Sequence, residues 1–163
     1  MEIQIYEIDE DYIDYLSQFE EHLFHNKQAH QNFERKYVGV LFSVGELNYF
    51  APLSSFKKKH IEMKERIDFI KIKNYCVINL NNMFPVSKEF CKLVDIANHS
   101  DIKYRKLLIT EARIIRAVEQ RIIKNANQLY DVYYRDDCDR SLKKRCNDFK
   151  MLEQKALEYS PQK

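Results

Sequence analysis

Residues 36–60 read KYVGVLFSVGELNYFAPLSSFKKKH, and this stretch decides the fold that we predict. Residues alternate between two faces from Val38 to Phe42, which is the period of a β-strand. Gly45 follows where a tight turn needs a residue that tolerates positive φ. Alternation returns from Leu47 to Ala51, so we predict a second strand and a β-hairpin.

A polar and basic segment follows the predicted hairpin. Pro52 is expected to end the second strand, because proline cannot donate to a strand ladder. Beyond it lie two hydroxyls, three ammonium groups and an imidazole, carried by Ser54, Ser55, Lys57, Lys58, Lys59 and His60. Ammonium groups neutralise phosphate oxygens, and hydroxyls donate hydrogen bonds to them. We therefore predict that this segment acts on a phosphodiester.

Composition is typical of a soluble globular protein. The chain has 163 residues, of which 45% are hydrophobic and 32% are charged, enough for one domain with a core. No apolar run approaches the roughly 20 residues of a membrane span, and the N-terminus does not resemble a signal peptide. We therefore expect a cytoplasmic protein with no membrane partner.

The net charge of +2 is unevenly distributed. Residues 1–35 carry nine acidic and two basic side chains, whereas the middle and C-terminal parts are basic. A polyanion would therefore meet residues 36–163, although basic side chains that merely solvate helix faces give the same pattern. The four cysteines have no CxxC spacing, so we expect reduced thiols rather than a zinc site. Glu21, His22 and His25 resemble metal ligands, but solvated side chains are the favoured interpretation, and we expect no metal or cofactor.

The remaining patterns predict an α+β protein. We expect one domain over residues 1–163, with a sheet core at about 1–87 and a helical part at about 88–159. The sheet should be compact, antiparallel and strongly twisted, or a partial barrel, covered by the C-terminal helices. Expected strands are residues 2–8, 69–72, 75–80 and 83–86, the last at a sheet edge. Expected helices are one after an Asp9 N-cap, one at 88–96, a long one capped by Ser100 or Asp101, and a last one beyond Asp139; residues 21–35 should be a loop.

Two polar features allow a structural or a functional interpretation. Asn79, Asn81 and Asn82 follow an apolar strand, and they suit either a sharp turn or hydrogen bonds to RNA bases and phosphates. Glu111 lies on the apolar stripe of the long predicted helix. An unpaired buried charge is costly, so we expect Glu111 to form a structural ion pair rather than to act as a catalytic acid.

RNA can be cut without a metal or a protein nucleophile, because its own 2′-hydroxyl can attack the adjacent phosphorus. The products are a 2′,3′-cyclic phosphate and a 5′-hydroxyl, and the protein must stabilise the phosphorane and move two protons. Lys57, Ser54 and Ser55 could bind the phosphate oxygens. Lys36, or Arg35 beside it, could reach the same end of the sheet. His60 is a candidate proton carrier, although a lone loop histidine more often only forms hydrogen bonds.

The segment 36–60, together with INLNNMFPV and a later YRKLLITE, resembles the ToxN/AbiQ family over roughly residues 2–130. These proteins are endoribonuclease toxins of type III toxin–antitoxin systems. The most specific pieces are APLSS-x-K-x-KH and INLNNM-x-PV. Phe56 stands where proline is usual, and Ser54 stands where some members have threonine.

The resemblance implies a fold like that of the MazF/Kid toxins and metal-independent RNA cleavage. It assigns catalysis to Ser54, Ser55, Lys57 and Lys36 or Arg35. To these we add candidate RNA-binding residues from the residue chemistry itself: Arg35, Tyr37, Lys58, Lys59, His60, Asn79, Asn81 and Asn82. The resemblance implies cellular or phage RNA as substrate. It also implies inhibition by an antitoxin RNA, a pseudoknot that the toxin trims from tandem repeats, in a closed protein–RNA hetero-oligomer. The alternatives are a non-catalytic RNA-binding module and a protein-interaction domain built on the C-terminal helices.

Overall fold

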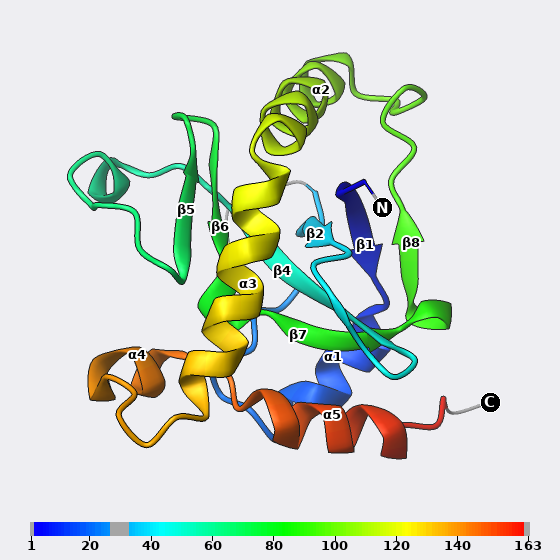
Figure 1. The fold of residues 1–163 in the computed structure, drawn as a ribbon. Coiled ribbons are helices and arrows are strands. Elements are labelled where there is room, and N and C mark those ends of the chain that lie inside the picture. The colour runs from blue at the N-terminus through cyan, green and yellow to red at the C-terminus, as the bar shows by residue number, and fades with distance from the viewer. Residues whose placement is uncertain (1, 27–32, 162–163) are drawn as a thin grey trace.

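The computed structural model describes residues 2–26 and 33–161. It shows an antiparallel sheet of eight strands with helices packed against it (Figure 1). The strands are β1 (Gln4–Ile8), β2 (Tyr37–Gly39), β3 (Ser43–Val44), β4 (Leu47–Ser55), β5 (Phe69–Ile72), β6 (Cys76–Asn79), β7 (Phe84–Ser87) and β8 (Cys91–Leu93). The α-helices are α1 (Glu10–Ser17), α2 (Ile102–Ala117), α3 (Glu119–Tyr133), α4 (Arg140–Arg145) and α5 (Phe149–Glu158). Short 3₁₀ turns are η1 (Lys58–His60), η2 (Leu80–Asn82) and η3 (Lys88–Phe90).

The expected α+β class and antiparallel sheet are confirmed. The strand order is β5-β6-β4-β2-β1-β8, with β3 and β7 paired to β4 beside this path. The sheet path is open, between β5 at one end and β8 at the other. The sheet also extends past the expected boundary at residue 87, because β8 pairs with β1.

β4 is the central strand, and the prediction that Pro52 ends it was wrong. β4 continues to Ser55, because the missing proline N–H falls where no partner strand needs it. The N–H of Leu53 donates to the carbonyl of Lys36, on the β2 side, so residue 52 faces the opposite edge. On that edge, pairing with β7 stops at Phe50 and pairing with β6 starts at Leu53.

The predicted hairpin is present in a broken form. Gly45 adopts a φ of +59°, as expected for the turn, and β3 pairs with the start of β4. The first strand is interrupted over residues 40–42, between β2 and β3. β2 pairs with the middle of β4, and β3 pairs with its start. The alternating segment that was predicted as one strand therefore forms two short strands.

Side chains of β4 alternate between two hydrophobic cores, one on each face of the sheet. Tyr49, Ala51 and Leu53 join a core with residues of α2 and α3. Phe50 joins the other core, with residues of α1 and α5. In Figure 1, α3 crosses in front of the sheet, while α1 and α5 lie beneath it. Because successive side chains of a strand point to opposite faces, Ser54 and Ser55 at the end of β4 lie on two different sides of the sheet.

Three helix predictions needed correction. Residues 88–96 were expected to form a helix, but they form η3 and then β8, because the free edge of β1 accepts a strand there. The long helix is capped by Asp101, yet it breaks at Val118, whose non-helical ψ of 17° separates α2 from α3. The last helix divides into α4 and α5, capped by Asp139 and Asp148.

The predicted cap of the first helix is confirmed, whereas the predicted loop at residues 21–35 is only partly described. Asp9 caps α1 as expected, since its carboxylate accepts the N–H of Tyr12. Within the expected loop 21–35, residues 27–32 lie outside the described residues. None of the helices in the described chain is long and apolar enough to cross a membrane.

Candidate active site

A pocket of about 550 Å³ opens between the end of β4 and the N-terminal half of α2. Three of the four residues expected to be catalytic line it: Lys36, Ser54 and Ser55. The rest of the lining comes from neighbouring strands and from α2, and consists of Phe33, Leu53, Tyr75, Cys76, Asp101, Lys103, Tyr104, Leu107, Leu108 and Glu111. The pocket is much larger than one phosphate, so it has room for a nucleotide.

The strand register separates the two candidate basic residues. Tyr37 lies opposite Pro52, so Lys36 lies beside Leu53 and Arg35 beside Ser54. Successive side chains point to opposite faces of a sheet. Lys36 therefore lies on the α2 side and lines the pocket, whereas Arg35 reaches Ser54 from the other side. The sequence alone did not decide which of Lys36 and Arg35 is the functional basic residue.

Lys36 is a buried cation at the wall of the pocket, only 6% exposed. Its Nζ donates to the carbonyl of Glu34 at 2.9 Å and lies 3.4 Å from a carboxylate oxygen of Glu7. The same Nζ lies 5.5 Å from the ring centroid of Tyr104. An ammonium group has three N–H donors. Two of them have these partners among the described residues, which leaves the third for an anion in the pocket.

The Ser54 hydroxyl is arranged as a hydrogen-bond donor. Its Oγ accepts from Nδ2 of Asn79 at 2.9 Å and from Nη1 of Arg35 at 3.2 Å. A hydroxyl has two lone pairs and one proton. With both lone pairs occupied, the O–H remains to be donated, and no acceptor for it occurs in the described part of the chain. Such a donor, polarised by a guanidinium, suits an anionic oxygen.

Arg35 is itself held in place from several directions. Its Nη1 also donates to the carbonyl of Leu53 at 2.9 Å, and its Nε donates to the carbonyl of His25 at 3.1 Å. Its guanidinium carbon lies 4.6 Å from the ring centroid of Phe24. Burial lowers the pKa of Arg35, but an arginine keeps its charge in proteins. The side chain therefore supports Ser54 from behind the pocket.

Ser55 faces the pocket from the α2 side of the sheet, next to a thiol and a carboxyl group. It lies directly opposite Cys76 in the pairing of β4 with β6. Cys76 in turn interacts with Glu111, which α2 holds over the same face and which is 6% exposed. Burial raises the pKa of Glu111 to about 7. The expected ion pair was wrong, because no cation pairs with Glu111 among the residues that the structure describes.

The basic loop beyond Ser55 is exposed and lies outside the lining of the pocket. The side chains of Lys57, Lys58 and Lys59 are open to solvent. His60 is 5% exposed, and its Nδ1 accepts the backbone N–H of Lys57 at 2.8 Å. Burial, and then the charges of nearby lysines, lower the pKa of His60. The histidine therefore stabilises the conformation of the loop, and its ring is buried.

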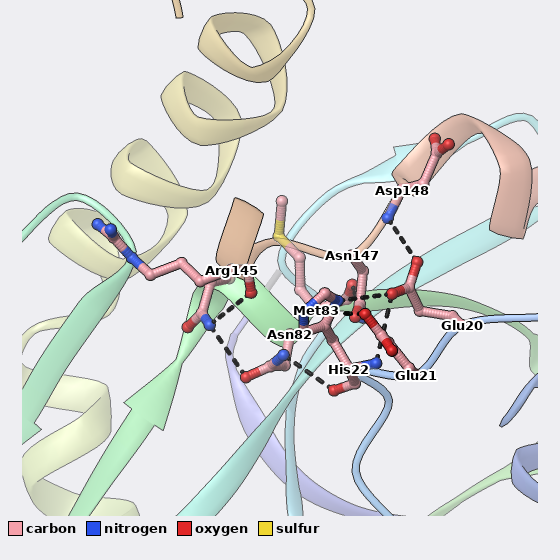
Figure 2. A network of polar contacts seen from close by, with 9 residues as sticks. Glu20, Glu21, His22, Asn82, Met83, Arg145, Asn147 and Asp148 are labelled. Atoms are coloured by element: carbon pink, nitrogen blue, oxygen red, sulfur yellow. Dashed lines mark hydrogen bonds and ion pairs between the residues drawn. The ribbon is translucent and has the colours of Figure 1, made fainter. Parts of the chain in front are cut away.

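Three other residues that were predicted to bind RNA form hydrogen bonds within the protein. The Tyr37 hydroxyl is buried and donates to Oδ1 of Asn26 at 2.8 Å. The asparagines form the expected sharp turn at η2, where Asn81 donates to the carbonyl of Arg145. Asn82 donates to the carbonyl of His22 (Figure 2). The turn thereby connects the segment after α1 with the end of α4. Asn82 is 5% exposed, and its side chain makes this connection within the protein.

The region around His22 gives no support to a metal centre. Nδ1 of His22 lies 2.8 Å from a carboxylate oxygen of Glu20, and Nε2 lies 3.9 Å from Glu21. Figure 2 shows this histidine beside both carboxylates. Across residues 2–26 and 33–161, no group of three or more His, Cys, Asp or Glu side chains could hold a metal ion. Glu20 instead accepts the backbone N–H of Asp148.

Sequence reasoning missed the part of the site that α2 supplies. Asp101 was one of two candidate helix caps, and Glu111 was placed on the apolar stripe of the long helix. The pattern contained no signal that this stripe lies over the end of β4. Cys76 was expected only to be a reduced thiol, and its position opposite Ser55 depends on the pairing of two strands.

Comparison with known proteins identifies the family. The family described as "Toxin ToxN, type III toxin-antitoxin system" matches residues 4–157. The chain is 31% identical over 160 residues to Endoribonuclease ToxN of Bacillus thuringiensis subsp. kurstaki, covering 93% of this chain and 81% of the relative. It is also 31% identical over 178 residues to Endoribonuclease AbiQ of Lactococcus lactis subsp. lactis, covering 98% and 91%.

Solved structures agree with this match. One, from work on selective toxin inhibition by a non-coding RNA pseudoknot in type III toxin–antitoxin systems, superimposes with a TM-score of 0.81 at 27% identity. It covers 99% of this chain and 100% of its own. Another, from work on a processed non-coding RNA that regulates a bacterial antiviral system, shares the fold with a TM-score of 0.83 at 23% identity over 97% and 99% of the two chains. The chain therefore belongs to the ToxN toxin family of type III toxin–antitoxin systems.

Proposed function

We propose that this protein is an endoribonuclease toxin that cleaves RNA in the pocket at the end of β4. Its curated relatives are endoribonucleases by name. The observation that carries the proposal is the convergence of Lys36, Ser54 and Ser55 in one pocket large enough for a nucleotide. Lys36 immediately precedes β2, whereas Ser54 and Ser55 end β4, so local sequence alone would not bring the three together.

The proposed reaction uses the 2′-hydroxyl of RNA as its nucleophile. That oxygen attacks the adjacent phosphorus, and the bond to the 5′-oxygen breaks, which leaves a 2′,3′-cyclic phosphate and a 5′-hydroxyl. The free N–H of Lys36 would donate to a non-bridging oxygen of the phosphate in the pocket, where negative charge grows in the phosphorane. The O–H of Ser54 would reach the RNA from the opposite face of the sheet, where Arg35 and Asn79 hold its oxygen. Ser55 would orient the phosphate on the α2 side. The reaction needs no metal when these donors supply the charge stabilisation.

Lys57 has a secondary place in this proposal. It follows Ser55 by two residues and is exposed outside the pocket lining. With Lys58 and Lys59 it would hold the RNA strand where that strand leaves the pocket, by neutralising flanking phosphates. His60 keeps this loop in the required conformation through its hydrogen bond to the Lys57 N–H.

We also propose that a structured RNA inhibits the toxin. A relative of known structure at 27% identity was studied for inhibition by a non-coding RNA pseudoknot. For this chain we propose such an RNA, released by the toxin from tandem repeats and bound in a closed protein–RNA assembly. The same phosphate-binding groups would hold substrate and inhibitor, so the inhibitor would act by occupying the pocket.

A cleavage assay in EDTA tests the proposal. Purified protein should cut single-stranded RNA and leave ends that accept a label from polynucleotide kinase at the 5′-hydroxyl. Ser55→Ala and Lys36→Met should each slow cleavage about 10²–10³-fold, the usual effect of removing one preorganised donor. The matched controls Ser17→Ala and Lys64→Met lie outside the pocket lining and should cleave normally.

The outcomes separate the candidate functions. Wild-type rates in both pocket variants would remove this pocket from the mechanism. Salt-dependent RNA binding with no product after long incubation would identify a non-catalytic RNA-binding module instead. For the inhibitor, the DNA immediately upstream of the coding region should contain tandem repeats, and RNA transcribed from them should suppress cleavage. Unchanged cleavage with this RNA in excess would contradict the inhibitor proposal alone.

A further inference from the structure

We propose that Glu111 is the general acid of the cleavage reaction, giving its proton to the 5′-oxygen as that oxygen leaves phosphorus. This inference rests on the proposed RNA cleavage in the pocket at the end of β4. It assigns a role to a buried carboxyl group that the ion-pair prediction failed to explain. Neither histidine chemistry nor a metal is required by it.

Only the side chain of Cys76 separates Glu111 from Ser55, where we place the phosphate. Ser55 is directly opposite Cys76 across the β4–β6 pair, and side chains in such positions have Cβ atoms about 4.5–5.5 Å apart. The carboxyl group of Glu111 interacts with Cys76, and all three residues line the same pocket. A nucleotide whose phosphate contacts Ser55 would therefore bring its bridging oxygens towards Glu111.

The groups around Glu111 favour its neutral, proton-carrying form. Cys76 faces it from β6 and Tyr104 from its own helix. Lys36 lies on the same pocket wall, but its charge is shared with Glu7 of β1 at 3.4 Å. Asp101 and Lys103 stand at the start of α2, with opposite charges.

The electrostatic consequence is that Glu111 carries a proton at neutral pH when RNA is bound. Burial raises the pKa of its carboxyl to about 7. An incoming phosphodiester is negatively charged, and a like charge disfavours ionisation further. After the transfer, the Cys76 thiol can donate to the new carboxylate. The residue is therefore suited to give a proton in the bound complex and to recover it once the product leaves.

Solvent water balances the two proton transfers of this step. The bond from O2′ to phosphorus forms as the bond from phosphorus to O5′ breaks. The proton of the 2′-hydroxyl passes to water, and the carboxyl proton of Glu111 passes to O5′, which departs as a hydroxyl. Water then returns a proton to Glu111. No oxidant, reductant or cofactor takes part.

A substrate with a sulfur at the leaving position tests this role directly. A 5′-bridging phosphorothiolate leaves as a thiolate, which needs no protonation. Glu111→Gln keeps the shape and the hydrogen-bonding capacity of the side chain but carries no acidic proton. We expect this variant to lose about 10²–10⁴-fold on the oxygen linkage, the usual range for general acid catalysis. On the sulfur linkage it should cleave within a few-fold of wild type.

The pH dependence is a second readout. On the oxygen linkage, the wild-type rate should fall above the pKa of Glu111, because the acid form is lost as pH rises. Both the sulfur substrate and the Glu111→Gln variant should lack this falling limb. Glu62→Gln, which removes an exposed carboxylate outside the pocket, is the matched control and should behave as wild type.

Each outcome decides the question. If Glu111→Gln were equally slow on both linkages, the residue would act in folding or in reading a base, and the acid role would be refuted. A rate within twofold of wild type on the oxygen linkage would refute it as well. In both cases the wild-type protein still cleaves RNA, so the proposed function stands. If the wild-type protein cuts neither substrate, the proposed function is refuted, and the acid role is refuted with it.

Discussion

Replacement of Glu111 by glutamine should stabilise the protein by an amount that grows with pH. The ordinary pKa of this carboxyl is 4.5, and burial raises it to about 7 in the folded protein. Between these two values the unfolded chain releases the proton while the folded chain retains it, so rising pH favours unfolding. The interval corresponds to about 3 kcal/mol at 1.36 kcal/mol per pKa unit. Glutamine does not ionise and escapes this loss.

The measurement is chemical and thermal unfolding of both proteins from pH 4 to pH 8.5. The free-energy difference between variant and wild type should rise by about 3 kcal/mol between pH 4.5 and pH 7 and then level off. In a chain of this size that corresponds to about 6–12 °C in melting temperature. Glu62→Gln, at an exposed position, should show no such trend. A difference that is flat with pH, or that shrinks as pH rises, would refute the assignment of Glu111 as a buried carboxyl without a cationic partner.

Three further predictions concern support of the site and of the fold. Asn79→Ala removes one donor to the Ser54 hydroxyl, so single-turnover RNA cleavage should slow about tenfold with an unchanged melting temperature; an unchanged rate would show that the Arg35 contact suffices. Gly39→Ala places a Cβ against the ring of Phe50 and should cost about 1–3 kcal/mol in urea unfolding, an estimate that fails if the midpoint does not move. Asp101→Ala removes the cap of α2 and should cost about 1 kcal/mol by thermal unfolding, whereas equal stability would mean that the helix end is held by other contacts.

The strands and helix caps of this protein were largely predictable because their signals are local. Alternation predicted the strand that contains β1, an apolar run predicted the strand that contains β6, and residues 69–72 were expected to form the strand that became β5. The asparagine-rich segment formed the expected turn at η2. Errors arose where a local rule depends on a distant neighbour. Pro52 did not end β4, because the strands on that edge left a gap opposite it. Residues 91–93 joined the sheet instead of a helix, because β1 offered an unpaired edge.

The site was predictable to a similar extent. The hydroxyls at 54 and 55 were named from residue type and spacing, and the basic residue was left as Lys36 or Arg35; Lys36, Ser54 and Ser55 line one pocket. His60 was a reasonable proton carrier by chemistry, but its burial against the loop backbone could not be inferred from sequence. Glu111 was recognised as a buried carboxyl, and its partner was predicted wrongly. A cation was the simplest expectation on energetic grounds, whereas the fold placed a thiol and a pocket beside it.

The sequence by itself determined the α+β class, the central polar and basic segment, and the family resemblance, because each of these depends on residues that are close together along the chain. Only the tertiary structure decided that Lys36 enters the pocket while Arg35 supports Ser54 from the opposite face. Only the tertiary structure placed α2 over the end of β4, with Glu111 next to Cys76 and Ser55. The physical reason is that strand register and helix docking are set by contacts between distant segments, and a shift of one residue exchanges the two faces of a strand.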